Sequence, residues 1–356
     1  MPARLPLRTR ALVLAASALV ACTGAAAQYA EPPTHSKLDG QLFYQLLIGE
    51  LQLRAGDAGS AYRDVLDAAI RTKDEQLFRR ATDIALQARA GDQALAAAQQ
   101  WRSEVPGSLD AHRYLIQLLI ALNRAPDTVE PLRSLLKLTP EAERANLIKI
   151  LPRFFGRVQD RQQVAGLLAQ VLQPYADEPA TRAAVNVALG RAWLIAADNG
   201  KAVEMARRAQ AQDPSGEGAA LLGLEMLPGT PAAEAVVTEH LKANPNSNAI
   251  RLMYSRVLAA SQRYGDAVAQ LEAVTGNQPQ IAPPWLTLGA LYLELRQPKQ
   301  AEVALQRYVE LLQAGGGSAV ADPHGAGDDG DGPTTLERGL TQAWLLLAQA
   351  AEQQKD

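Results

Sequence analysis

Residues 285–305 read WLTLGALYLELRQPKQAEVAL, and this stretch decides the fold. In its first half, Leu288, Gly289 and Tyr292 follow Trp285 by three, four and seven residues. This spacing places all four on one face of a helix. Ala301 and Leu305 follow at helical spacing in the second half. Antiparallel helices approach closely only where side chains are small, so we expect Gly289 and Ala301 where two helices cross.

The prolines of the chain show the period of this helix pair. Proline disrupts a helix and pushes the residue before it out of helical conformation, so evenly spaced prolines mark the ends of repeats. They are Pro106, Pro140, Pro174, Pro214, Pro245 and Pro279, with gaps of 34, 34, 40, 31 and 34 residues. A repeat of about 34 residues, one helix pair long, therefore runs through most of the chain.

The composition agrees with a helical repeat protein. Hydrophobic residues make up 47% of the sequence but aromatic residues only 5%, so Ala, Leu and Val must form most of the core. We therefore expect an all-α protein. The net charge of −3 provides no basic surface for a phosphate backbone, which argues against a nucleic-acid partner.

The pattern W-x2-L-G-x2-Y from Trp285, followed by Ala301 and Leu305, resembles the tetratricopeptide repeat (TPR). The resemblance extends over residues 38–312 in about eight units and weakens toward the N-terminus. It implies a right-handed superhelical solenoid. The unit from Glu143 to Pro174 has lost its small residues, and the unit before Pro245 has a shortened first helix, so we expect an irregular array there.

The sequence after residue 312 departs from the pattern. Residues 313–334 are rich in Gly and Asp and predict a flexible loop; Asp328, Asp329 and Asp331 do not fit the spacing of a calcium loop. Residues 335–354 predict a capping helix that covers the last apolar face of the solenoid. Its apolar stripe is expected to be Leu340, Trp344, Leu347 and Ala351.

The N-terminus has the features of an export signal. Three arginines precede the apolar stretch 11–21, which is too short to span a bilayer. Residues 19–22, Leu-Val-Ala-Cys, resemble the lipobox of bacterial lipoproteins, which implies a signal peptide 1–21, lipidation of Cys22 and, because Thr23 follows, transfer to the outer membrane. Residues 22–37 would be a spacer. Cleavage after Ala27, with a signal peptide 1–27 and a soluble periplasmic product, stays open.

A candidate peptide-binding groove follows from the TPR register, in which the first helix of each repeat lines the inner surface. The inward positions include Leu147 and Leu151, and the candidate binding residues are Arg79, Arg113, Arg191, Arg256, Leu252 and Leu286. Arginines in a concave channel favour carboxylates, so an acidic or C-terminal peptide segment is the expected ligand class. Alternatively, these arginines pair with acidic neighbours of the protein itself.

No pattern of an enzyme, cofactor or metal site is present. The four histidines at 35, 112, 240 and 324 lack partners at ligand spacing, and Asn199-Gly200-Lys201 lacks the remainder of a phosphate loop. We expect no cofactor, metal or small-molecule substrate. The resemblance implies a non-enzymatic scaffold like the periplasmic and outer-membrane TPR lipoproteins of Gram-negative bacteria. The alternatives are an envelope enzyme with an active site near 143–174 and a cytosolic TPR regulator.

Overall fold

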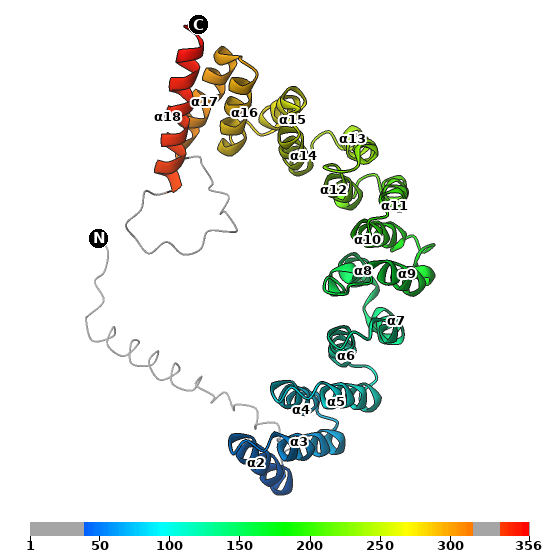
Figure 1. Ribbon diagram of the computed structural model, residues 1–356. Coiled ribbons are helices and arrows are strands. Elements are labelled where there is room, and N and C mark those ends of the chain that lie inside the picture. Colours follow the sequence, from blue (N-terminus) through cyan, green and yellow to red (C-terminus); the bar gives the residue numbers. More distant parts are fainter. Residues whose placement is uncertain (1–38, 316–334, 356) are drawn as a thin grey trace, which may run out of the picture. The chain divides into compact units, whose positions relative to one another are not determined.

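The computed structural model describes residues 39–315 and 335–355 (Figure 1). The predicted signal peptide, Cys22, the spacer and most of the predicted loop 313–334 lie outside these residues. The described residues form seventeen α-helices and three short 3-10 helices without a strand, so the prediction of an all-α repeat array is confirmed. The right-handed superhelix stays a prediction.

The chain divides into an N-terminal part up to Glu104 and a C-terminal part from Val105 onward. The N-terminal part contains two helix pairs: α2 (Gly40–Arg54) with α3 (Ala58–Thr72), and α4 (Glu75–Gln87) with α5 (Gly91–Glu104).

The C-terminal part contains six further helix pairs and a last helix. The first three pairs are α6 (Leu109–Ala121) with η1 (Ala125–Thr128) and α7 (Val129–Leu138), α8 (Glu141–Phe154) with α9 (Arg161–Leu172), and α10 (Arg182–Ile195) with α11 (Asn199–Gln212). The next three are α12 (Glu217–Met226) with η3 (Pro231–Ala233) and α13 (Glu234–Ala243), α14 (Asn248–Ala260) with α15 (Tyr264–Asn277), and α16 (Ala282–Glu294) with α17 (Pro298–Gln313). Helix α18 (Thr335–Gln353) follows, and η2 (Gln173–Tyr175) extends α9.

One turn joins the two helices in six of the eight described pairs. A residue in left-handed conformation ends the first helix, at Gly56, Arg89, Asn123, Ala197, Gln262 and Arg296. The backbone N–H of the next residue then donates to a carbonyl five residues back, as Gln297 does to Tyr292 at 2.8 Å. This Schellman turn provides hydrogen-bond donors for the last carbonyl groups of the first helix within three residues. The second helix therefore begins at once and packs antiparallel to the first.

Glycine lies at the helix crossing in four pairs. A Cβ atom on Gly289 would lie 2.5 Å from Leu305 Cγ and 3.4 Å from the carbonyl of Ala301. A Cβ atom on Gly49, Gly190 or Gly223 would likewise lie 3.3 to 3.7 Å from the carbonyl oxygen of an alanine. The missing side chain therefore lets the two helices of a pair approach to backbone contact.

The α8–α9 pair is built differently. The large residues Leu147, Ile148, Leu151 and Phe155 are buried in its core, and Pro152 lies inside the last turn of α8. A six-residue connection, 155–160, replaces the Schellman turn. Both α8 and α9 contact α10. The loss of small residues between Glu143 and Pro174 thus coincides with an irregular pair.

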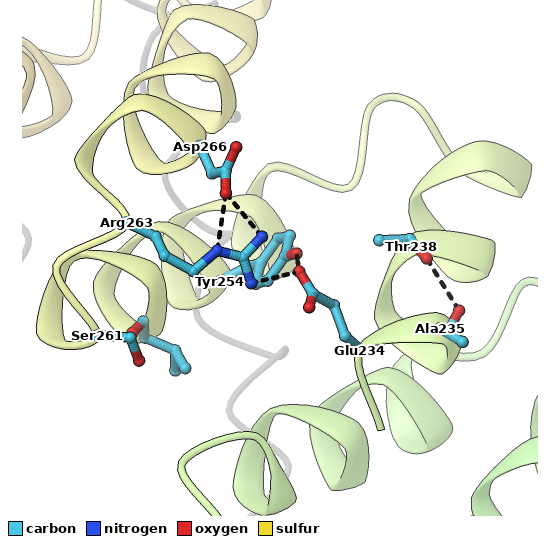
Figure 2. A network of polar contacts seen from close by, with 8 residues as sticks. Glu234, Ala235, Thr238, Tyr254, Ser261, Arg263 and Asp266 are labelled. Atoms are coloured by element: carbon cyan, nitrogen blue, oxygen red, sulfur yellow. Dashed lines mark hydrogen bonds and ion pairs between the residues drawn. The ribbon is translucent and has the colours of Figure 1, made fainter. Parts of the chain in front are cut away.

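A polar network ties the α12–α13 pair to the α14–α15 pair (Figure 2). The hydroxyl of buried Tyr254 donates to Glu234, and the guanidinium of Arg263 lies between Glu234, at 2.8 Å, and Asp266, at 2.6 Å. Burial, and secondly the bond to Glu234, raises the pKa of Tyr254 above its usual value. Tyr292 repeats this contact one pair later by donating to Glu272 at 2.5 Å. The junctions on both sides of the α14–α15 pair therefore contain the same tyrosine–glutamate bond.

Helix α18 packs on α16 and α17, as expected of a last helix (Figure 1). The predicted apolar stripe is wrong in part. Leu340 and Leu347 are partly buried, but Trp344 and Ala351 are exposed, and the fully buried positions are Ala343 and Ala350. Small side chains allow the closest approach of two helices, so the alanines rather than the tryptophan face α16 and α17.

Candidate peptide-binding site

The predicted groove arginines lie on first helices of their pairs. Arg79 is exposed on α4 in the N-terminal part. In the C-terminal part, Arg113 lies on α6, Arg191 on α10 and Arg256 on α14, so the three occupy alternate pairs. Leu252 and Leu286 are half-buried. Within the C-terminal part, the structure therefore spreads the three arginines over alternate helix pairs.

Internal pairing explains two of the arginines. Arg191 binds Glu225 on α12 in bidentate fashion, with Nε–Oε2 and Nη2–Oε1 distances of 3.1 and 2.6 Å, and only 15% of its side chain is exposed. Arg113 lies 3.3 Å from Asp110 on its own helix. Arg256 is exposed, and no ion pair in the described residues involves it. Of the three in the C-terminal part, Arg256 is therefore the arginine most accessible to a ligand.

In the α8–α9 pair, the residues predicted at inward positions do not line a groove, because Leu147 and Leu151 are buried in the core. A pocket of about 1020 Å³ lies beside this pair instead. It is bounded by the end of α6, the α6–η1 turn, the end of α8 and the start of α9. The six-residue connection of the irregular pair forms one of its walls.

The chemistry of this pocket, which we call the amide pocket, is mixed. Four primary amides line it, from Gln117, Asn123, Gln159 and Gln163. No hydrogen bond joins these four side chains to another described residue. Each amide provides both a donor and an acceptor. The amides can therefore pair with the N–H and C=O groups of a bound extended backbone.

Apolar and charged groups complete the lining. Ile120, Pro126 and Phe154 supply the apolar surface. Arg157 and Asp160 provide the charges, and the Asp160 carboxylate accepts from the backbone N–H of Gln163 at 2.9 Å. This combination suits a peptide whose backbone binds the amides while one apolar side chain contacts Phe154.

A second pocket, of about 600 Å³, lies between α15, α16 and α17. Its lining is mostly apolar and includes Trp285, Tyr292 and Val303. The indole N–H of Trp285 donates to the carbonyl of Pro279 at 3.1 Å, which fixes the half-buried ring at the pocket wall. Here the polar atoms of the aromatic residues are already bonded within the protein, whereas those of the amide pocket are not.

Catalysis and metal binding would require several titratable side chains close together. Between Glu143 and Pro174 the only carboxylates are Glu143 and Asp160, and no histidine or cysteine occurs. Nowhere in 39–315 or 335–355 do three His, Cys, Asp or Glu side chains gather closely enough to hold a metal ion. None of the helices described is both long and apolar enough to cross a membrane.

The alternative that the groove arginines pair with acidic neighbours holds for Arg113 and Arg191, whereas the amide pocket was not predicted. The Arg191–Glu225 pair spans 34 residues, one repeat period, and comparison of each inward residue with its counterpart one repeat later could have found it. The bidentate pair of Arg80 with Glu50, at 2.7 Å, similarly joins neighbouring first helices. The amide pocket depends on the placement of the α8–α9 connection, for which the sequence carries no local signal.

Comparison with known proteins gives structural neighbours only. No protein-family model and no curated protein matches the sequence. The structure is similar to MamA of AMB-1, at 18% identity and a TM-score of 0.32 over 47% of this chain and 93% of that one. It is also similar to a tetratricopeptide repeat protein from Parabacteroides merdae ATCC 43184, at 10% identity and a TM-score of 0.30 over 86% of this chain and 100% of that one.

Similarity at this level carries no argument about function, and the fold is identified by its own geometry. Eight helix pairs, a recurring Schellman turn and glycine at the helix crossings occur in the described residues. The last pair contains the residues of the TPR pattern, with Gly289 against Ala301 and Leu305. The chain has a TPR-like fold: an all-α array of helix-turn-helix repeats.

Proposed function

We propose that this chain is a non-enzymatic scaffold of the cell envelope that holds an extended segment of a partner protein in the amide pocket. The observation that carries the proposal is a pocket of about 1020 Å³ with four amide side chains that make no hydrogen bond within the described protein. Amides bind peptide backbone irrespective of sequence, and the apolar wall selects a side chain.

The location follows from the N-terminal sequence. A signal peptide would export the chain, and Cys22 would carry the acyl chains that hold it at the outer membrane, facing the periplasm. Cell fractionation of a Cys22→Ala variant tests the anchor. The wild type should sediment with the membranes and the variant should be soluble; equal solubility of both would contradict lipidation.

The binding site can be tested with random peptides displayed on phage, selected on the protein with Cys22→Ser to keep it soluble. We expect selected peptides to bind at least about tenfold more weakly after Gln159→Ala with Gln163→Ala, because the double variant removes the hydrogen bonds of two amides to the peptide. The matched control is Gln342→Ala with Gln349→Ala, two exposed glutamines of α18. Equal affinity of both double variants would contradict the amide pocket.

The same assay tests the alternative site, in which arginines of the first helices hold an acidic or C-terminal peptide. Arg256→Glu is the cleaner variant, because reversal of Arg191 also breaks its pair with Glu225. If Arg256→Glu abolishes binding and the glutamine variants do not, the inner arginines rather than the amide pocket hold the peptide. The reverse result supports the amide pocket.

A further inference from the structure

Helix α2, the first of the described array, exposes an unusual apolar stripe. Phe43, Tyr44, Leu47 and Leu51 are 55, 64, 45 and 52% exposed. Phe43, Leu47 and Leu51 are spaced by four residues, so they form one continuous row along the helix, with Tyr44 beside it. Scattered exposed hydrophobic residues are common, but a continuous row marks a surface that another molecule covers.

The opposite side of α2 already has a partner. Leu42 and Gly49 are buried, and the space beside Gly49 is closed by Val65 of α3 at 3.3 Å from a Cβ atom placed there. Glu50 borders the stripe toward α4, where Arg80 pairs with it. The exposed row is therefore additional to the packing surface of the N-terminal part.

The remaining charges of α2 and its N-cap lie at the two ends of the stripe. Asp39, exposed, caps the N-terminus by accepting from Leu42 N–H at 2.6 Å, and Arg54, also exposed, lies in the last turn. Read from either end, the surface presents one charge, a row of apolar side chains and the opposite charge. Such a surface is complementary to itself when two copies lie antiparallel.

We propose that a second copy of this chain covers the stripe in a two-fold α2–α2 contact. With the symmetry axis at Leu47, the two Leu47 side chains meet and each Phe43 lies opposite Leu51 of the other copy. Asp39 then approaches the Arg54 end of the second helix. A parallel arrangement would place like charges together, so the charges select the antiparallel one.

Thiol cross-linking tests the arrangement. Cys22 is the only cysteine of the chain, so in a full-length Cys22→Ser background each added cysteine is unique. A short bis-maleimide should join two copies of Leu47→Cys into a covalent dimer, whereas Leu345→Cys, at a 67% exposed position of α18, should stay monomeric. A mixture of Phe43→Cys and Leu51→Cys chains should cross-link more than Phe43→Cys alone. Preferential cross-linking of Phe43→Cys to itself would contradict the antiparallel contact.

Analytical ultracentrifugation of the same background measures the dimer without cross-linking. Leu47→Glu places two carboxylates against each other at the axis and should raise the dimer dissociation constant at least about tenfold, and Leu345→Glu should leave it unchanged. A monomer at all concentrations would overturn the proposal, as would cross-linking of Leu47→Cys to Leu345→Cys, which indicates a head-to-tail contact with α18. Binding of the monomer to lipid vesicles, lost in Leu47→Glu, would instead show that a membrane covers the stripe.

Discussion

The α16–α17 and α8–α9 pairs belong to repeats of similar length but differ where their helices meet. In α16–α17, Gly289 faces Ala301 and Leu305 at backbone contact, and Arg296 closes a three-residue turn. In α8–α9, large residues fill the core and a six-residue connection follows Pro152. Small residues at the α16–α17 crossing thus allow close packing of the two helices, and their absence in α8–α9 accompanies the pocket that we propose as the binding site.

The largest effect is expected from the same substitution in each of the two regions. Gly289→Ala should lower the free energy of unfolding by about 2 to 3 kcal/mol, because the new Cβ atom overlaps Leu305 and the helices must separate. Gly166→Ala in α9, where no atom lies within 4 Å of the new Cβ, should raise it by up to about 1 kcal/mol through helix propensity.

Urea unfolding measures both variants, and hydrogen exchange shows whether Gly289→Ala loosens α16 and α17 in particular. If both variants change stability in the same direction, the close approach of the two helices at Gly289 does not limit the size of the residue there.

A smaller loss is expected from the bond between neighbouring pairs. Tyr254→Phe removes a donor to Glu234 and should lower the free energy of unfolding by about 1 to 2 kcal/mol. Tyr292→Phe, which removes the equivalent bond to Glu272, should have a similar effect. Thermal unfolding of the two variants checks this. A neutral Tyr254→Phe would mean that burial of the ring rather than the bond joins the pairs.

The Schellman turns predict opposite effects at two equivalent positions. Gly56→Ala should lower stability by about 1 kcal/mol, since φ is +87° and a side chain is disfavoured there. Gln262→Gly, at a φ of 60°, should raise stability by about 0.5 kcal/mol. Chemical unfolding of both variants measures the effects, and destabilisation by Gln262→Gly would show that its side chain makes a contact worth more than the strain.

The smallest expected effect is a pH dependence from His240 in the α12–α13 pair. Burial lowers the pKa of His240 below its usual value of 6.5, although Glu217 and Asp213 act in the opposite direction. The unfolded chain therefore takes up a proton first, so stability should fall as the pH drops below about 6.5. Unfolding at pH 7.5 and 5.5 should show a smaller difference in His240→Gln than in the wild type. An unchanged difference would exclude His240 as its source.

The regular parts of this fold follow from sequence because they depend on local residue size. The Trp285 pattern and the proline period predict the helix pairs. The loss of small residues after Glu143 and the shortened helix before Pro245 mark the two irregular ones, α8–α9 and α12–α13. The predicted apolar stripe of α18 is wrong in part, because it follows the large apolar residues, whereas the buried residues are Ala343 and Ala350.

The candidate site depended on contacts between repeats. The sequence leaves open whether Arg191 binds a ligand or an acidic neighbour, because its partner Glu225 lies one period away. The amide pocket is lined by Gln117 of the α6–α7 pair and Gln163 of the α8–α9 pair. The sequence alone does not show how close these two pairs lie.

Hydrogen exchange of the wild type, with and without a peptide selected on it, shows whether the α8–α9 pair forms the binding site. A peptide in the amide pocket should protect the end of α6, Asn123, and the 155–160 connection with the start of α9. Protection confined to α10 and α14, around Arg191 and Arg256, would contradict it.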